Sequence, residues 1–133
     1  MREILFRGKR TDNGEWVEGS LRIDPDLKTA SIWWFGYSPD EMERWEEAES
    51  VDPETVVQFT GLTDKNGRKI FEGDIVEYDE ELCPVVYEPD AGMFELCGFG
   101  FVADFSYIDS SIFCEVVGNI YDNPELLKMS KND

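Results

Sequence analysis

Short runs of alternating apolar and polar residues, separated by turns rich in glycine, asparagine and aspartate, follow one another along the chain. In residues 15–23, the odd-numbered positions from 17 onwards are mostly apolar and the even-numbered positions are polar or aromatic. This alternation is the pattern of a strand with one buried face. Asn13-Gly14 just before it supplies the positive φ angles of a tight hairpin. The predicted strands cover residues 4–7, 15–23, 29–35, 55–59, 74–78, 85–88, 93–96, 99–105 and 112–120.

This spacing of short strands predicts a mainly β fold, with α+β as the alternative, built as a small antiparallel β barrel or sandwich. The segment Gly73-Asp74-Ile75-Val76, followed by a meander, is similar to the first strand of SH3-like barrels, so the C-terminal half is expected to be SH3-like. We expect a single domain over residues 1–133. Its first part, 1–69, holds β hairpins and a short acidic helix, and its second part, 70–127, holds an acidic β-meander with a C-terminal helical turn.

Two places carry helix signals. Ser38-Pro39-Asp40-Glu41 combines a capping serine, a proline at the first helical position and acids in the first turn. The stripe that follows, Met42 and Trp45, is thin, so this helix is expected to be short and to face solvent. Asn123-Pro124 opens a second helical turn in the same way. The fold is therefore expected to contain one or two short helices.

Three stretches resemble a known family. Residues 2–7 form a charged Arg-Glu-Ile-like strand. Residues 58–76 contain Thr-Gly-Leu-x-Asp-x-Asn-Gly and Glu-Gly-Asp-Ile-Val, and residues 117–127 contain Gly-Asn-Ile-Tyr-x-Asn-Pro-Glu-Leu. This set resembles the YopX family of phage and prophage proteins over essentially the whole chain. The resemblance implies a phage or prophage origin and supplies no catalytic residues to transfer.

Charge is distributed unevenly along the chain, whose net charge is −18. Residues 70–127 hold 14 Asp and Glu and no Lys or Arg. Such a surface cannot neutralise nucleic-acid phosphates, and an anionic membrane would repel it. We therefore expect neither direct nucleic-acid binding nor membrane binding. A basic host protein is the kind of partner that this field favours, and an acidic surface that only promotes solubility is the alternative.

Cys83, Cys97 and Cys114 are odd in number, lie beside apolar residues and form no Cys-x-x-Cys pair. Free, buried thiols in a reducing cytoplasm are the expected arrangement. The first residues lack the long apolar stretch of a secretory signal, and no run is long enough for a membrane span. The bacterial host cytoplasm is the expected location.

The sequence contains no histidine, which removes the commonest general base and the usual triads. It also contains no phosphate-binding or dinucleotide loop, so we expect no cofactor and no catalytic residues. Asp79-Glu80-Glu81 is a weak candidate for a hard cation, although a solvated loop is the simpler interpretation. Asp64-x-Asn66-Gly67 shares a few positions with a calcium loop but lacks its distal glutamate, so it is interpreted as a turn. The chain is not expected to be an enzyme.

Trp33, Trp34 and Trp45 are the candidate interaction residues. Adjacent Trp33 and Trp34 must lie on opposite faces of a strand, so one ring needs the acidic helix, a second copy or a ligand to cover it. The sequence thus favours a non-enzymatic interaction protein that self-associates. The alternatives are an acidic DNA mimic that inhibits a host DNA-binding protein, and a carboxylate-only hydrolase dependent on a divalent metal.

Overall fold

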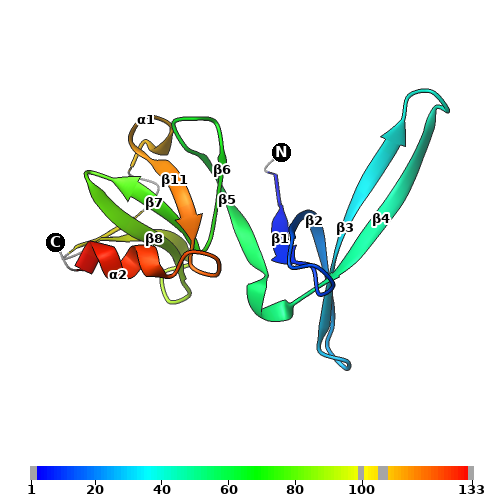
Figure 1. Cartoon of the computed structure of the whole chain (residues 1–133), viewed down its shortest axis with the longest axis horizontal. Helices are drawn as coiled ribbons and strands as arrows, with labels where there is room; N and C mark the ends of the chain where they lie inside the picture. Colours follow the sequence, from blue (N-terminus) through cyan, green and yellow to red (C-terminus); the bar gives the residue numbers. More distant parts are fainter. Residues whose placement is uncertain (1–2, 99–100, 105–107, 132–133) are drawn as a thin grey trace. The chain divides into compact units, whose positions relative to one another are not determined.

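The computed structural model describes residues 3–98, 101–104 and 108–131. The chain divides into two compact units, residues 1–58 and 59–133. We call them the N-terminal unit and the C-terminal unit and describe each separately. From the sequence, the boundary between the two parts of the domain was expected after residue 69. Both units are built from antiparallel strands (Figure 1).

The N-terminal unit is an antiparallel sheet with the order β4-β3-β2-β1-β5. A one-turn 3-10 helix precedes β5, and the first residues of β5 pair with β1. Ala30, Ile32 and Val51 form the buried centre of one sheet face. The strands are β1 (Phe6–Lys9), β2 (Trp16–Asp24), β3 (Thr29–Ser38), β4 (Glu43–Val51) and β5 (Val57–Thr63), and the 3-10 helix is η1 (Pro53–Thr55).

The helix expected after Ser38 is wrong, because residues 43–51 form strand β4, which pairs with β3 along its full length. The capping signal is real but closes a turn: the Ser38 hydroxyl accepts a hydrogen bond from the Glu41 N–H at 3.4 Å. Met42 then takes a positive φ of 57° and reverses the chain. Cross-strand pairing outweighs local helix propensity here, since the thin apolar stripe offered a helix little to bury.

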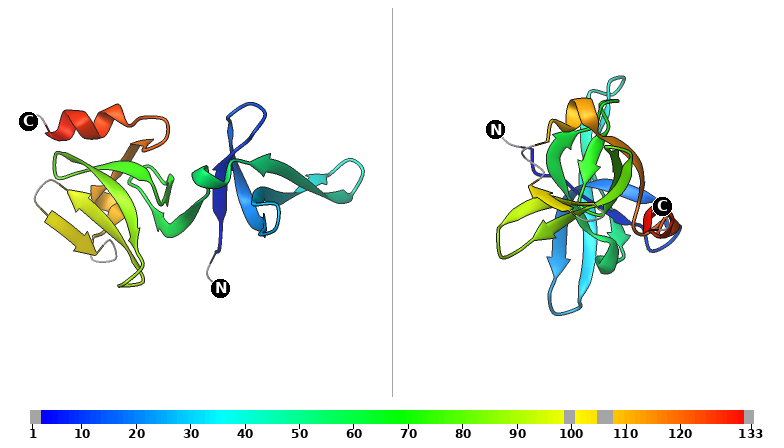
Figure 2. Two further views of the ribbon diagram at one scale, coloured as in Figure 1. Left: turned by 90° about the horizontal axis from the view of Figure 1, so that it is seen from below. Right: turned by 90° about the vertical axis from the view of Figure 1, so that its left-hand side faces the viewer.

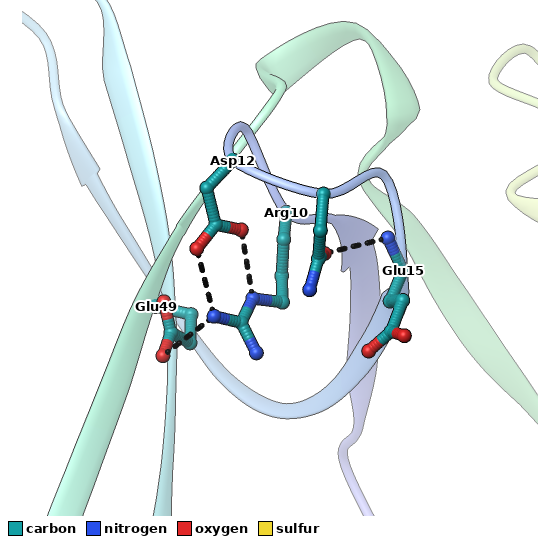
Figure 3. Close-up of polar contacts among 5 residues, drawn as sticks. Arg10, Asp12, Glu15 and Glu49 are labelled. Carbon is teal, nitrogen blue, oxygen red and sulfur yellow. Dashed lines mark hydrogen bonds and ion pairs between the residues drawn. The ribbon is translucent and has the colours of Figure 1, made fainter.

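Arg10 ties the β1–β2 turn to the end of β4 (Figure 3). Its guanidinium makes two hydrogen bonds to the Asp12 carboxylate, at 3.0 and 2.8 Å, and an ion pair with Glu49 at 3.3 Å. The Thr11 N–H donates to the Ser50 carbonyl at 3.0 Å. The hydrogen bond from Arg10 holds the pKa of the Asp12 carboxyl below its ordinary value. These contacts fix where β4 leaves the sheet.

The C-terminal unit contains a second antiparallel sheet, with the order β10-β9-β8-β7-β11, and a β5–β6 pair. The buried core collects apolar residues from most of these strands, among them Ile70, Val76, Val85 and Leu96. Helix α2 lies against β8 (Figure 2). The additional strands are β6 (Lys69–Phe71), β7 (Asp74–Tyr78), β8 (Glu81–Glu88), β9 (Met93–Gly98), β10 (Phe101–Asp104) and β11 (Glu115–Asn119), and the helices are α1 (Ser110–Phe113) and α2 (Glu125–Lys131).

The predicted mainly β, antiparallel fold with two short helices is confirmed. The sheets are open, and the described strands do not close into a barrel.

The strand expected over 112–120 begins later, because residues 110–113 form α1. Residues 99, 100 and 105 of another expected strand lie outside the described residues. Within the described ranges, no helix has both the length and the apolar character needed to cross a membrane.

Candidate interaction surface

One face of the N-terminal sheet pairs aromatic rings with cations. The Arg7 guanidinium lies 4.6 Å from the centre of the Trp16 ring, Arg22 lies 4.3 Å from Trp33, and Arg44 lies 4.1 Å from Phe35. The strand register places these groups on the same side, because directly paired residues of antiparallel strands and alternate residues of one strand share a face. We call this side the cation–aromatic face; its paired positions include Lys9↔Trp16, Arg7↔Glu18, Ser20↔Trp33, Phe35↔Glu46 and Tyr37↔Arg44.

The three candidate tryptophans do not form one cluster. Trp34 lies on the opposite side of the sheet, packed against the buried core. Trp33 belongs to the cation–aromatic face, where its Nε1 donates to the Ser31 hydroxyl at 2.8 Å. Trp45 faces the same side as Trp34 and covers Gly36, where an added Cβ would lie 2.4 Å from the indole ring. The prediction that Trp33 and Trp34 occupy opposite faces is confirmed, and Arg22 partly covers the outer ring.

Within the N-terminal unit, the most exposed aromatic residues lie where β3 and β4 continue beyond β2 as a pair. Pairing between β2 and β3 ends at Ser20↔Trp33, whereas β3 and β4 stay paired to their tips. We call the outer part, residues 34–38 paired with 43–47, the aromatic ribbon; Figure 1 shows β3 and β4 running past β2 as a two-stranded arm. Phe35 is 59% exposed and Tyr37 57%. These two residues were not among the predicted interaction residues, because the segment that follows them was expected to form a helix.

A hollow of about 420 Å³ opens where the aromatic ribbon departs from β2. Trp33, Trp34 and Phe35 of β3 form one wall, and residues 19–22 of β2 form another. Gly19 is required at this junction, because a Cβ there would lie 2.2 Å from the Trp33 carbonyl oxygen. We call this hollow the notch; Leu5 and Glu46 complete its lining.

The candidate metal residues form a tight turn. Tyr78 pairs with Glu81, so Asp79 and Glu80 are the two residues that connect β7 to β8. Both have positive φ, 51° and 66°, a conformation that costs residues with a side chain about 1–2 kcal/mol each. No cluster of three or more metal-ligating side chains occurs among the described residues. Asp79 and Glu80 thus form the β7–β8 turn, and Glu81 begins β8.

The Asp64 carboxylate organises the C-terminal unit. Asp64 is only 2% exposed, and one of its oxygens accepts hydrogen bonds from the N–H groups of Asn66 and Arg68, both at 2.9 Å. The other oxygen accepts from the Val116 N–H of β11 at 2.9 Å. Burial alone raises the pKa of the Asp64 carboxyl, but these donors outweigh burial and hold the pKa below its ordinary value. The Asp64-x-Asn66-Gly67 segment is thus a turn, as predicted.

In the third family-like stretch, residues 117–127, side-chain hydrogen bonds also cap the backbone. The Asn119 side-chain oxygen accepts from the N–H groups of Tyr121 and Asp122, and the Asn123 side chain accepts from the Asn119 N–H. Gly118 is needed because a Cβ there would meet the Asn123 side-chain oxygen at 2.6 Å. The motifs that carry the family resemblance therefore hold turns and strand junctions in place.

The cysteines offer no activated thiol. Burial raises the pKa of both Cys83 and Cys114 to about 11, and it also raises the pKa of Cys97. All three are free, and Cys83 and Cys114 are buried in the core. High pKa values keep these thiols protonated and poorly nucleophilic. The prediction of free thiols is confirmed, and burial is confirmed for Cys83 and Cys114, whereas Cys97 is partly exposed.

Comparison with known proteins agrees with this fold and covers both units. The structure is similar to the crystal structure of protein EF1440 from Enterococcus faecalis, with a TM-score of 0.61 and 28% sequence identity over 96% of this chain and 99% of that chain. No curated protein matches the sequence at a significant level. The family model described as YopX protein matches residues 5–128. The chain therefore belongs to the YopX protein family.

Proposed function

We propose that this protein is a non-enzymatic interaction protein, encoded by a phage or prophage and acting in the bacterial cytoplasm, and that the aromatic ribbon contacts its partner. The observation that carries this proposal is the exposure of Phe35 and Tyr37 on a two-stranded arm that packs on no further strand among the described residues. A two-stranded ribbon is marginally stable alone, and exposed aromatic residues are enriched where proteins bind one another. The ribbon is thus an element whose burial by a partner would stabilise it.

Capture from host lysate with chemical crosslinking tests the role of the ribbon. We expect the double variant Phe35→Ser/Tyr37→Ser to lose the proteins that the unmodified chain captures. The matched control is Ile23→Ser/Leu27→Ser, which removes two apolar side chains of the β2–β3 hairpin that are at least as exposed. Capture that is identical for both double variants would contradict the proposal. If both double variants still capture the same proteins, and duplex DNA displaces those proteins, the DNA-mimic alternative is favoured instead.

Self-association is the second part of the proposal. Because Trp34 faces the core and Arg22 partly covers Trp33, these rings do not themselves require a second copy. Support comes instead from Ile112 and Phe113, adjacent on α1 and each 61% exposed. Apolar side chains exposed side by side are typical of contact surfaces.

Sedimentation equilibrium tests self-association. We expect species larger than the monomer at micromolar concentration, and we expect Ile112→Ser/Phe113→Ser to return the protein to monomer because it removes the apolar contact area. Phe35→Ser/Tyr37→Ser is the control and should leave the sedimentation unchanged. If the unmodified chain is a monomer throughout the concentration range, self-association is contradicted. The role of the aromatic ribbon would still be decided by the capture experiment.

A further inference from the structure

We propose that the notch binds an extended, basic polypeptide segment, which joins β3 as an additional strand and places a large apolar side chain in the hollow. This inference rests on the proposed function, in which the aromatic ribbon contacts a partner protein. It adds the chemistry of the partner and the site at which the partner is seated.

The first observation is a sheet edge. Among the described residues, those of β3 beyond Trp33 pair as a strand with β4 alone. Alternate residues of this stretch therefore direct their backbone N–H and C=O groups towards the notch. Exposed edges of this kind bind extended peptides by strand addition, in which main-chain hydrogen bonds supply affinity and side-chain pockets supply specificity.

The second observation is the size and lining of the hollow beside that edge. Its volume of about 420 Å³ lies within the range of ligand pockets, which is roughly 300–1,000 Å³. Among its lining residues, Leu5, Trp33 and Phe35 supply apolar side chains. A strand hydrogen-bonded to β3 would project alternate side chains towards one sheet face, so one large apolar side chain could enter the hollow while its neighbours remain outside.

The third observation is charge. Residues 34–47 contain five carboxylates and one arginine, and that arginine, Arg44, lies over the Phe35 ring. Arg22, which lies over Trp33, and Glu46 both line the notch and balance each other, so the excess negative charge beside the notch comes from the ribbon. A segment with lysine or arginine flanking its apolar side chain would complement these carboxylates. The ribbon of a second copy would carry the same negative charge and be repelled, so we assign the notch to a different, basic chain.

Binding of designed strand peptides to the full chain tests this assignment. The probe is fluorescein-labelled Lys-Val-Lys-Phe-Lys-Val-Lys, measured by fluorescence anisotropy at physiological salt against its acidic counterpart Glu-Val-Glu-Phe-Glu-Val-Glu. We expect the basic peptide to bind at least about tenfold more tightly than the acidic one. Two N-methylated versions of the basic peptide, blocking the N–H groups of one strand edge or of the other, should differ. One should lose binding and the other should retain it, because only one edge faces β3.

Two variants locate the site. Ser20 is exposed at the notch, so Ser20→Trp should fill the hollow and weaken binding at least about tenfold. Ser50→Trp is the matched control, since it adds the same ring to an exposed serine of the sheet outside the notch, and it should bind like the unmodified chain. Circular dichroism of both variants should match that of the unmodified chain, which checks that they are folded.

Several results would overturn the inference. If both N-methylated peptides lose binding to the same extent, or if both keep it, then no strand is added to β3. If Ser20→Trp leaves binding unchanged, the basic peptide is attracted by the overall negative charge of the protein and does not occupy the notch. Conversion of an oligomer to monomer by Ser20→Trp alone would place a second copy in the notch. If the peptides fail to bind while Phe35→Ser/Tyr37→Ser still loses captured partners, the proposed function stands and this inference falls.

Discussion

Gly19→Ala is expected to destabilise the N-terminal unit by about 3 kcal/mol, the upper end of the usual cost of overpacking. The new Cβ would lie 2.2 Å from the Trp33 carbonyl oxygen and 2.9 Å from its carbon. Both are main-chain atoms of the neighbouring strand, so no side-chain rotation can relieve the contact. β3 must move away from β2, and the Ser20↔Trp33 end of their ladder would separate.

Urea denaturation of the variant measures the loss of unfolding free energy, and hydrogen exchange followed by mass spectrometry locates it. Faster exchange should appear first in β2 and β3. Ser20→Ala, one residue further on, is the matched control, because Ser20 is exposed and a surface substitution usually changes stability by less than about 0.5 kcal/mol. Equal stability of Gly19→Ala and Ser20→Ala would show that the two strands do not approach so closely.

The second large effect is expected from Asp64→Ala in the C-terminal unit, with a loss of about 3 kcal/mol or more. The substitution leaves the N–H groups of Asn66, Arg68 and Val116 without their carboxylate acceptor, and hydrogen bonds to charged groups contribute about 1.5–3 kcal/mol each. Faster hydrogen exchange in β11 and in the 64–68 turn should accompany the loss of unfolding free energy.

Asp24→Ala is the matched control. Asp24 also accepts hydrogen bonds from two backbone N–H groups, those of Asp26 and Leu27, but in an exposed turn. Because water can replace those bonds, this change should cost much less than Asp64→Ala. Similar losses for both variants would show that burial of the Asp64 network contributes nothing.

The pH dependence of stability follows from the same carboxylate. The pKa of Asp64 is lowered in the folded chain, so its contribution is fully present above the pKa of an unfolded aspartate, about 3.9, and is lost as the pH falls through the folded pKa. Asp64→Asn removes this titration. The difference in unfolding free energy between the unmodified chain and Asp64→Asn should therefore shrink as the pH falls below about 4. A difference independent of pH would contradict the assignment.

Much of the fold could be predicted from local pattern. Strand β7 covers the predicted residues 74–78 and begins directly after Gly73. Gly14 has the positive φ, 73°, expected of an Asn-Gly turn. The helix expected after Ser38 failed because a capping signal also closes a hairpin, and only pairing with β3 decides between the two. Local pattern specifies turns and single strands more strongly than it specifies which strands meet.

The candidate surface was less accessible from sequence. Adjacent residues of a strand face opposite sides of the sheet, so the placement of Trp33 and Trp34 on opposite faces was predicted. The stacking of Arg22 and Arg44 on rings in neighbouring strands depends on registers that the sequence does not reveal. The bond from Val116 to Asp64 spans 52 positions and has no local signal. The notch depends on where β2 stops pairing with β3, which is a property of two strands together.

The outer part of the β3–β4 arm pairs only within itself, and this has an evolutionary consequence. Apart from Trp34, which packs against the N-terminal core, its side chains can be exchanged without disturbing either core, whereas the motif residues around Asp64 and Asn119 hold turns and strand junctions. Lineages that keep the same scaffold would be free to vary residues 35–47, and with them the partner proposed for the aromatic ribbon. We therefore expect relatives to diverge in binding specificity while remaining alike in architecture.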